Sequence, residues 1–341
     1  DSRFFYYALI PLDFASVAGG TALPYLTVAA LQEIPIRIPD LHKQREIAQI
    51  LGAFDDKIEL NRRMNETLEE MARALFKCWF VDFEPVRLKA KGIDPSLPPE
   101  KGLSACGNAQ AGGLGLDPEI AALFPDSFVD SELGEIPKGW AVKPLDEVAD
   151  FLNGLAMQKH PAKPDDPNSL PVIKIAQLRS GNTQSADRAS RTFPDEYLVK
   201  DGDLVFSWSG SLEVVFWAGG EGALNQHLFK VSSMEYPTWF YYHWLLHHLP
   251  TFRQIAAGKA TTMGHIQRHH LTQALAVVPD KRLTTAADNV FAPLVRLIVA
   301  NAVNNGRLAA TRDALLPKLI SGEMDIFSVK SEKQIEEKVH E

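Results

Sequence analysis

Apolar residues recur three and four positions apart along two long stretches of the chain. The first stretch carries them at Ile47, Ile50, Phe54, Ile58, Leu68, Leu75 and Trp79, and the second at Val290, Leu294, Ile298, Leu308, Leu315 and Leu319. This spacing is typical of a coiled-coil seam, so it predicts two long helices within residues 41–83 and 281–322. Asp40 and Asp280, which each follow a proline, are expected to cap them.

The two stretches match at a constant offset of 240 residues, which indicates an internal duplication. Leu31 matches Leu271, Pro39-Asp40 matches Pro279-Asp280, and Asn61 and Asn65 match Asn301 and Asn305. Asparagines inside a seam fix its register at a cost in stability, so we expect the two helices to pair with each other. The alternative is two separate amphipathic helices, each packed on its own domain.

Between the helices the pattern changes twice. Residues 84–130 hold six glycines and six prolines with little periodicity, which predicts an irregular linker. Residues 131–280 mix helical spacing at Val142–Leu152 and Trp239–Leu249 with strand patterns at 170–178, 201–210 and 213–231. The fold class predicted is therefore α+β, with a mixed domain joined to long helices and a charged tail over 323–341.

Composition narrows the class of protein. The 341 residues are 45% hydrophobic and carry a formal net charge of −8, which argues against indiscriminate nucleic-acid binding but permits a local binding patch. Two cysteines cannot make a disulfide framework, and we find neither a signal peptide nor an apolar run of about 18 residues. We therefore expect a cytoplasmic protein with no membrane partner. Because Phe4-Phe5-Tyr6-Tyr7 resembles domain interior, we also expect the sequence to begin within a fold.

Catalytic signatures are mostly absent from the sequence. It has no GxxxxGK[ST], no GxGxxG after a strand, no HExxH and no Asn/Asp-Pro-Pro-aromatic loop, and Pro194-Asp195-Glu196 is only faintly nuclease-like. The histidines at 243, 247, 248, 265, 269 and 270 lack a neighbouring Cys, Asp or Glu ligand, so structural roles are favoured over a metal cluster. We expect no catalytic residue, no metal and no cofactor.

Two windows, residues 167–186 and 236–279, contain no acidic residue but many donors and acceptors. Phosphate contacts use Lys, Arg, Ser and Thr, whereas base edges are read by Arg, Asn, Gln, Ser and Thr. Clustering of these residue types therefore favours a DNA reader over ordinary solvated surface. The candidate DNA-binding residues are Lys174, Gln177, Arg179, Ser207, Ser209, Ser211, Asn225, Gln226, His227, Lys259, Thr261, Thr262, His265, Gln267 and Arg268.

Several segments together resemble the specificity subunits of type I restriction–modification systems. They are LEEMARALFKCWFVDF (68–83), SELGEIPKGW (131–140), GDLVFSWSGS (202–211), GALNQHLFKV (222–231) and AAGKATTMGHIQRHHL (256–271). The resemblance implies two target recognition domains, each followed by a long helix, with the helices paired antiparallel to set the distance between two DNA half-sites. It also implies double-stranded DNA, methyltransferase subunits and a restriction/translocase subunit as partners, and adenine methylation by the assembled complex.

The resemblance is incomplete at the start of the chain. A counterpart of residues 131–240 is absent from the first copy, so residues 1–40 are expected to be the C-terminal remnant of a first recognition domain, and only residues 131–280 to read DNA. Two other classes stay open: a stand-alone nuclease or fused restriction–methylation fragment, and a coiled-coil scaffold that does not bind DNA.

Overall fold

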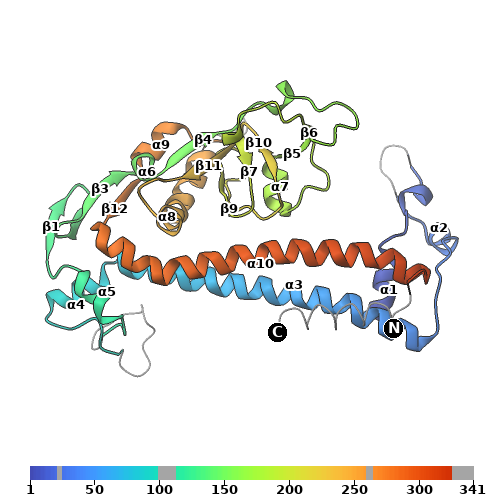
Figure 1. Cartoon of the computed structure of the whole chain (residues 1–341), viewed down its shortest axis with the longest axis horizontal. Helices are drawn as coiled ribbons and strands as arrows, with labels where there is room; N and C mark the ends of the chain where they lie inside the picture. Colours follow the sequence, from blue (N-terminus) through green and yellow to red (C-terminus); the bar gives the residue numbers. More distant parts are fainter. Residues whose placement is uncertain (21–24, 99–112, 259–263, 325–341) are drawn as a thin grey trace. The chain divides into compact units, whose positions relative to one another are not determined.

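The computed structural model describes residues 1–20, 25–98, 113–258 and 264–324 (Figure 1). The chain divides into two compact units, Asp1–Arg63 with Asn304–Glu341, and Met64–Val303. Two long helices, α3 (Leu41–Phe76) and α10 (Lys281–Ser321), each contribute residues to both units.

The predicted helices and their caps are confirmed. A five-residue π-turn, η2 (Lys77–Val81), follows α3 and buries Cys78, Trp79 and Phe80. At the start of α3 the amide of Lys43 donates to Asp40 Oδ1 at 3.0 Å, and at the start of α10 the amide of Arg282 donates to Asp280 Oδ1 at 2.8 Å. These amide donors stabilise the ionised carboxylates and lower the pKa of both aspartates.

The asparagines pair across the two helices, so the alternative of two separately packed helices is wrong. In the first unit Asn61 Nδ2 donates to Asn305 Oδ1 at 2.8 Å, and Asn305 Nδ2 to the Ile58 carbonyl at 3.4 Å. In the second unit Asn301 Nδ2 donates to Asn65 Oδ1 at 2.9 Å, and Asn65 Nδ2 to the Ile298 carbonyl at 3.0 Å. Adding 240 to the α3 residue number of each bond and subtracting 240 from its α10 residue number gives the corresponding bond of the other set. The duplication therefore extends to individual hydrogen bonds.

The first unit is small and lacks a sheet in its described residues. It contains α1 (Ser2–Leu9), the 3₁₀ turn η1 (Ala15–Val17) and α2 (Val28–Gln32) beside its parts of the long helices. Phe4 and Tyr7 of α1 pack on Ile47, Leu51, Leu316 and Leu319. The Tyr7 hydroxyl donates to Asp55, which also pairs with Arg312, and burial is the main reason that the pKa of Tyr7 rises to about 12.

The second unit is a mixed α+β domain, as predicted. One four-stranded sheet has the order β6-β5-β10-β7, in which β5 and β10 run parallel, and the other has the antiparallel order β4-β11-β8-β9. Two-stranded ribbons, β1-β2 and β12-β3, complete it. The strands are β1 (Phe128–Ser131), β2 (Gly134–Pro137), β3 (Ala141–Pro144), β4 (Asp150–Asn153), β5 (Leu170–Ile173), β6 (Arg188–Ala189), β7 (Leu198–Val199), β8 (Leu204–Ser207), β9 (Val214–Phe216), β10 (Gly222–Leu224), β11 (Leu228–Ser232) and β12 (Leu275–Val278).

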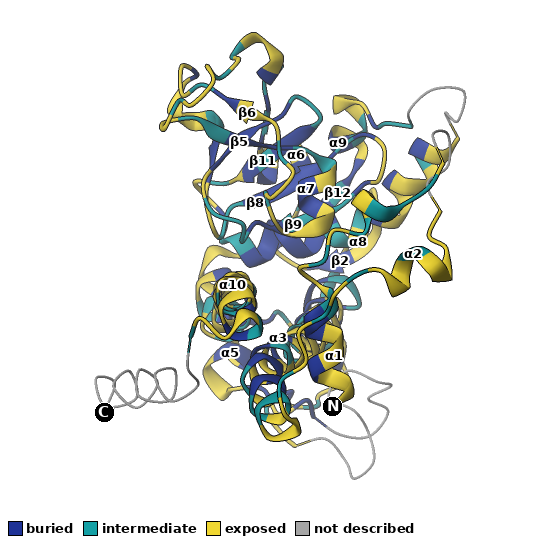
Figure 2. Cartoon of the chain, turned by 90° about the vertical axis from the view of Figure 1, so that its right-hand side faces the viewer, coloured by how far each residue is buried: buried dark blue, intermediate teal, exposed yellow. Residues whose placement is uncertain are grey.

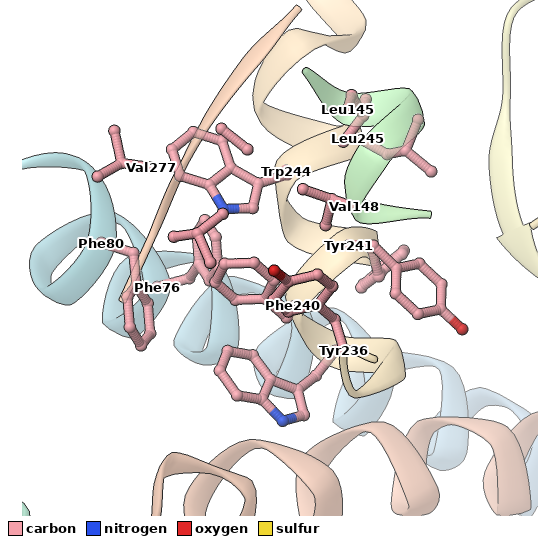
Figure 3. Close-up of a cluster of buried hydrophobic side chains, with 14 of the residues drawn as sticks. Phe76, Phe80, Leu145, Val148, Tyr236, Phe240, Tyr241, Trp244, Leu245 and Val277 are labelled. Carbon is pink, nitrogen blue, oxygen red and sulfur yellow. The ribbon is translucent and has the colours of Figure 1, made fainter. Parts of the chain in front are cut away.

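Helix α8 (Thr238–Ala257) is the centre of the core of this unit. Its aromatic residues pack against the end of α3 and the start of α10: Trp239 stacks on Phe291 with ring centroids 4.4 Å apart, and His243 on Phe76 at 5.0 Å (Figure 3 shows Phe240 and Trp244 in the same cluster). The other helical segments are α4 (Glu84–Ala90), α5 (Pro118–Leu123), α6 (Leu145–Val148), η3 (Met157–Lys159), α7 (Ile175–Ser180), η4 (Asp195–Tyr197) and α9 (Arg268–Gln273).

Several expectations about local structure are wrong. The described parts of the linker expected over 84–130 include α4 and α5, because Val86, Leu88 and Ile120 are buried in the core and hold them. The helix expected over 142–152 is instead β3, α6 and β4, since pairing of β3 with β12 overrides its helical spacing. The strand expected over 170–178 ends at Ile173, where β5 gives way to α7. Lastly, residues 213–231, whose pattern predicts two strands joined by a glycine-rich turn, form three strands in two sheets.

Helix α10 bears on the expectation that the chain holds no apolar stretch of about 18 residues. It is long and apolar enough to cross a membrane by length and composition, with an 18-residue window of mean hydropathy 1.3. The same helix carries the asparagines that bond to α3, and its apolar residues include the core residues Phe291 and Val295. Of that window 22% is buried, so packing against α3 and α8 accounts for part of its apolar composition.

Candidate nucleic-acid interface

Three segments that are distant in sequence meet beside the sheet β4-β11-β8-β9. They are the loop after β8 (207–211), the turn between β10 and β11 (225–227) and the segment before α9 (264–268), and we call them the three-segment cluster. The amide of Ile266 donates to the Trp208 carbonyl at 3.0 Å, that of Gly210 to Gly264 at 2.8 Å, and that of Trp208 to His227 at 3.3 Å. Backbone bonds therefore hold the loops as one surface.

Trp208 lies at the centre of this cluster. Its indole Nε1 donates to Asn153 Oδ1 at 2.9 Å, and its ring lies 5.7 Å from that of His227 and 6.3 Å from that of His265. Ser209 Oγ bonds His227 Nδ1 at 3.1 Å. Two candidate histidines are thus fixed around one half-buried tryptophan. Neither Trp208 nor Asn153 was among the residues predicted, although a tryptophan between two serines is an available signal for a ring on a polar loop.

Arg268 is exposed but held in place. Its guanidinium lies 5.8 Å from the centroid of the Phe229 ring, and Nη2 donates to the Phe151 carbonyl at 3.2 Å. A guanidinium has five N–H donors in a planar fork. Because the ring and the carbonyl fix the orientation of this fork, Arg268 resembles a preorganised anion or base contact more than a free surface arginine.

Some candidate residues are buried and serve the fold. Ser207 is fully buried, donates to the Ser211 carbonyl at 2.5 Å and accepts from the Glu213 amide at 2.8 Å. Gln177 is 6% exposed and accepts the Lys174 amide at the start of α7. Asn225 is 3% exposed and its Oδ1 accepts from the His227 amide at 3.3 Å. Ser209 is also buried, at 3% exposed, and bonds His227 Nδ1, so these four candidate side chains are held by groups of the fold.

The remaining candidates fall into three groups. Gln226, His227 and His265 are half-buried, whereas Ser211, Gln267 and Arg268 are exposed, and all six belong to the three-segment cluster. Lys174 pairs with Asp187, and Arg179 is exposed on α7. Lys174 directly follows β5, and Asn225 directly follows β10. Because these two strands are parallel neighbours, both residues lie at the same edge of the sheet. Lys259, Thr261 and Thr262 lie outside the described residues.

A shallow groove of about 390 Å³ borders the cluster. Gly210, Ser211, Glu213, Arg253 and Gly264 are among the residues that line it. Arg253 donates to the Leu212 carbonyl at 2.9 Å and pairs with Glu213 at 3.2 Å. The positive charge of Arg253 is therefore neutralised by Glu213. The uncharged side chains of the cluster, Gln226, His265 and Gln267, are more suitable for reading bases.

Two histidines of α8 make structural contacts. His243 is buried, bonds the Trp239 carbonyl at 2.7 Å and stacks on Phe76, while His248 bonds the Leu275 carbonyl at 2.9 Å. Burial lowers the pKa of each to about 4, so both are neutral near pH 7. No group of three metal-ligand side chains occurs among the residues that the structure describes.

Comparison with known proteins identifies the family. A family model described as the type I restriction modification DNA specificity domain matches residues 1–70 and 137–274. The type I restriction enzyme HindI specificity subunit of Haemophilus influenzae is 26% identical, over 88% of this chain and 71% of its own length. The MjaIX specificity subunit of Methanocaldococcus jannaschii is also 26% identical, over 91% of this chain and 65% of its own.

Two solved structures are similar as well. The type I restriction-modification S subunit from M. genitalium has a TM-score of 0.45 and 15% identity, covering 94% of this chain and 72% of that one. The HsdS subunit from Thermoanaerobacter tengcongensis has a TM-score of 0.31 and 18% identity, covering 95% and 71%. Since the family model matches more than half of the sequence and includes parts of both copies of the repeat, this chain belongs to the type I restriction modification DNA specificity family.

Proposed function

We propose that this chain is the DNA-recognition subunit of a type I restriction–modification complex and that residues 131–280 read one half-site. The observation that carries the proposal is the three-segment cluster, in which amide, imidazole and guanidinium groups from separate loops are fixed by backbone bonds on one surface. Such uncharged groups with one oriented arginine can discriminate base edges in a major groove.

The chain itself is proposed to be non-catalytic and to need no cofactor. Methyltransferase subunits would bring the methyl donor and methylate adenine, and a restriction/translocase subunit would join the same complex. The paired helices α3 and α10 are the proposed spacer and docking element, because their asparagine contacts fix a register while their outer residues stay exposed. Double-stranded DNA would thus bind to an acidic subunit with help from basic partners.

Within the cluster we assign different roles to different residues. Gln226, Gln267 and His265 are the proposed base readers. Arg268, oriented by Phe229, would contact a guanine or a phosphate. Ser207 and Asn225 would act as positioning residues. Lys174, Arg179, Ser211, Lys259, Thr261 and Thr262 remain proposed contacts from the flanking segments.

The test uses the complex assembled with methyltransferase subunits. Gln267→Ala and Gln226→Ala should each weaken binding to the cognate site by about 5- to 150-fold, as expected for loss of one bidentate base contact, with little change on nonspecific DNA. Gln273→Ala, at the other end of α9, is the matched control and should bind like the original chain. Arg268→Ala should lower the slope of log K against log salt by about 1 if it contacts a phosphate, whereas a guanine contact would instead relax sequence preference.

Two results would contradict the proposal. One is cleavage or methylation of DNA by the purified chain alone with Mg²⁺ and a methyl donor, which would make it an enzyme. The other is unchanged DNA retention by a complex that carries Gln226→Ala, Gln267→Ala and Arg268→Ala together, which would leave the chain as a scaffold.

A further inference from the structure

Ser209, His227 and Gln226 are joined by hydrogen bonds within the three-segment cluster, and we call them the Ser–His–Gln network. Ser209 is 3% exposed, and its Oγ lies 3.1 Å from His227 Nδ1. The other ring nitrogen, His227 Nε2, lies 3.4 Å from the side-chain nitrogen of Gln226, and both of these residues are half-buried. The network therefore connects a buried serine to an amide that is a proposed base reader.

The two paired strands β8 and β11 bring the network together. Ser207, the last residue of β8, lies opposite Leu228, the first residue of β11. Figure 2 shows both strands coloured mostly as buried. The His227 amide donates to Asn225 Oδ1 at 3.3 Å, and its carbonyl accepts from the Trp208 amide at 3.3 Å. The backbone of His227 is therefore held from two sides, so its imidazole can orient a neighbouring side chain.

The atoms at the ends of the network determine where its protons lie. An amide nitrogen donates and does not accept, so Gln226 donates to His227 Nε2. A neutral imidazole that accepts at Nε2 carries its proton on Nδ1, which then donates to Ser209 Oγ. One tautomer of His227 thus satisfies both bonds, and the same tautomer keeps the amide nitrogen of Gln226 turned toward the ring.

The outer edge of the Gln226 carboxamide consequently has a defined pattern. One of its N–H groups bonds His227, and no other side-chain bond of Gln226 occurs among the described residues. Its Oε1 and its second N–H remain, which places an acceptor beside a donor. This pattern is complementary to the N6 amino group and N7 of adenine in the major groove. A carboxamide turned the other way would present only donors, which suit the acceptors O6 and N7 of guanine.

We propose that Gln226 reads an adenine of the DNA half-site, and that Ser209 and His227 are positioning residues that set this preference by fixing the carboxamide. The inference rests on the proposed function, because it names the base that one reader of the same surface takes. The bonds of the network must all run in the same direction. A change at Ser209 should therefore alter the base preference although Ser209 itself is buried.

The test measures base preference in the complex assembled with methyltransferase subunits, by selecting bound DNA from a randomised library. Gln226→Ala should lower the preference for adenine at one position by about 5- to 150-fold, which identifies that position. Ser209→Ala and His227→Phe should each lower it at the same position by about fivefold, as expected for loss of one hydrogen bond. Ser209→Thr, which keeps the hydroxyl, should retain the preference. Ser232→Ala, exposed at the end of β11, is the control.

A merely structural role of Ser209 predicts a different result. If Ser209 acts through Gln226, Ser209→Ala should have no further effect at that position in a complex that already carries Gln226→Ala. Loss of preference at all positions together would instead show a general disturbance of the fold and would overturn the proposal.

The tautomer of His227 is measured separately, in the full chain without DNA. Nitrogen NMR spectra of histidine side chains distinguish a lone pair on Nε2 from one on Nδ1, and His227→Phe identifies the signal. We expect the lone pair on Nε2. A lone pair on Nδ1 would reverse the network and overturn the assignment to adenine.

The proposal also fails if Gln226→Ala relaxes no position, or relaxes one that prefers another base. Unchanged preference in both Ser209→Ala and His227→Phe would equally contradict it. These results leave DNA recognition by Gln267 and Arg268 intact. Failure of the proposed function is a different observation, namely unchanged DNA retention by the complex with Gln226→Ala, Gln267→Ala and Arg268→Ala together.

Discussion

The asparagine pair Asn65–Asn301 provides a quantitative test of helix pairing. Replacing Asn301 with alanine removes the amide that donates to Asn65 Oδ1 at 2.9 Å. Asn301 is 9% exposed, so water replaces the lost bond poorly, and the expected cost is about 1–3 kcal/mol of unfolding free energy. Asn65→Ala should cost a similar amount, since it also removes the bond to the Ile298 carbonyl.

The double replacement separates the pair from its surroundings. If the side chains stabilise each other, the double variant should be destabilised by about 1 kcal/mol less than the sum of the single variants. Urea unfolding followed by helical circular dichroism measures this, provided that the slope with urea stays constant. Asn304→Ala, on the exposed side of α10, is the control and should change stability by no more than about 0.5 kcal/mol. A coupling below about 0.3 kcal/mol would refute the argument that these asparagines fix the register.

Three further outcomes follow from other contacts. In the folded state the pKa values of His243 and His248 are about 4, below the unfolded value of 6.5. The stability that each neutral histidine contributes should therefore be fully present above pH 6.5 and be lost as pH falls toward 4, by up to about 3 kcal/mol for each. Urea titrations at several pH values should show a smaller pH dependence for His243→Phe. Arg312→Leu removes the partner of Asp55 and should cost about 1–3 kcal/mol, whereas the exposed Arg307→Leu should cost little; equal urea midpoints would contradict this. Gly154→Ala places a Cβ 2.2 Å from the Asn225 carbonyl, so it should displace the 225–227 turn and reduce DNA retention by the complex while helical circular dichroism is kept; full retention would show that the turn is dispensable.

The long helices were predictable because several independent signals coincide in them. The three-and-four spacing, the Pro-Asp caps and the repeated asparagines all describe the same two segments, and each is local in sequence. The short elements of the second unit were not predictable in this way. Residues 142–152 have helical spacing, but β12, about 130 positions away, imposes a strand on part of them.

The candidate interface was predictable as a set of segments more than as a set of side chains. The loops at 207–211, 225–227 and 264–268, which composition had singled out separately, lie together in the structure. Whether a serine faces solvent or the core depends on tertiary partners, and Ser207 faces the core because the Glu213 amide and the Ser211 carbonyl satisfy it there. The orienting role of Phe229 toward Arg268 requires two residues that are far apart in sequence.

The reciprocal asparagine bonds limit how these helices can change length during evolution. Inserting four residues between Asn61 and Asn65 would move one asparagine by about 6 Å relative to the other. Only one of the bonds to Asn305 and Asn301 could then form, unless α10 gained the same four residues between its own asparagines. Insertions and deletions in this interval should therefore be inherited as matched pairs, one in each copy of the repeat.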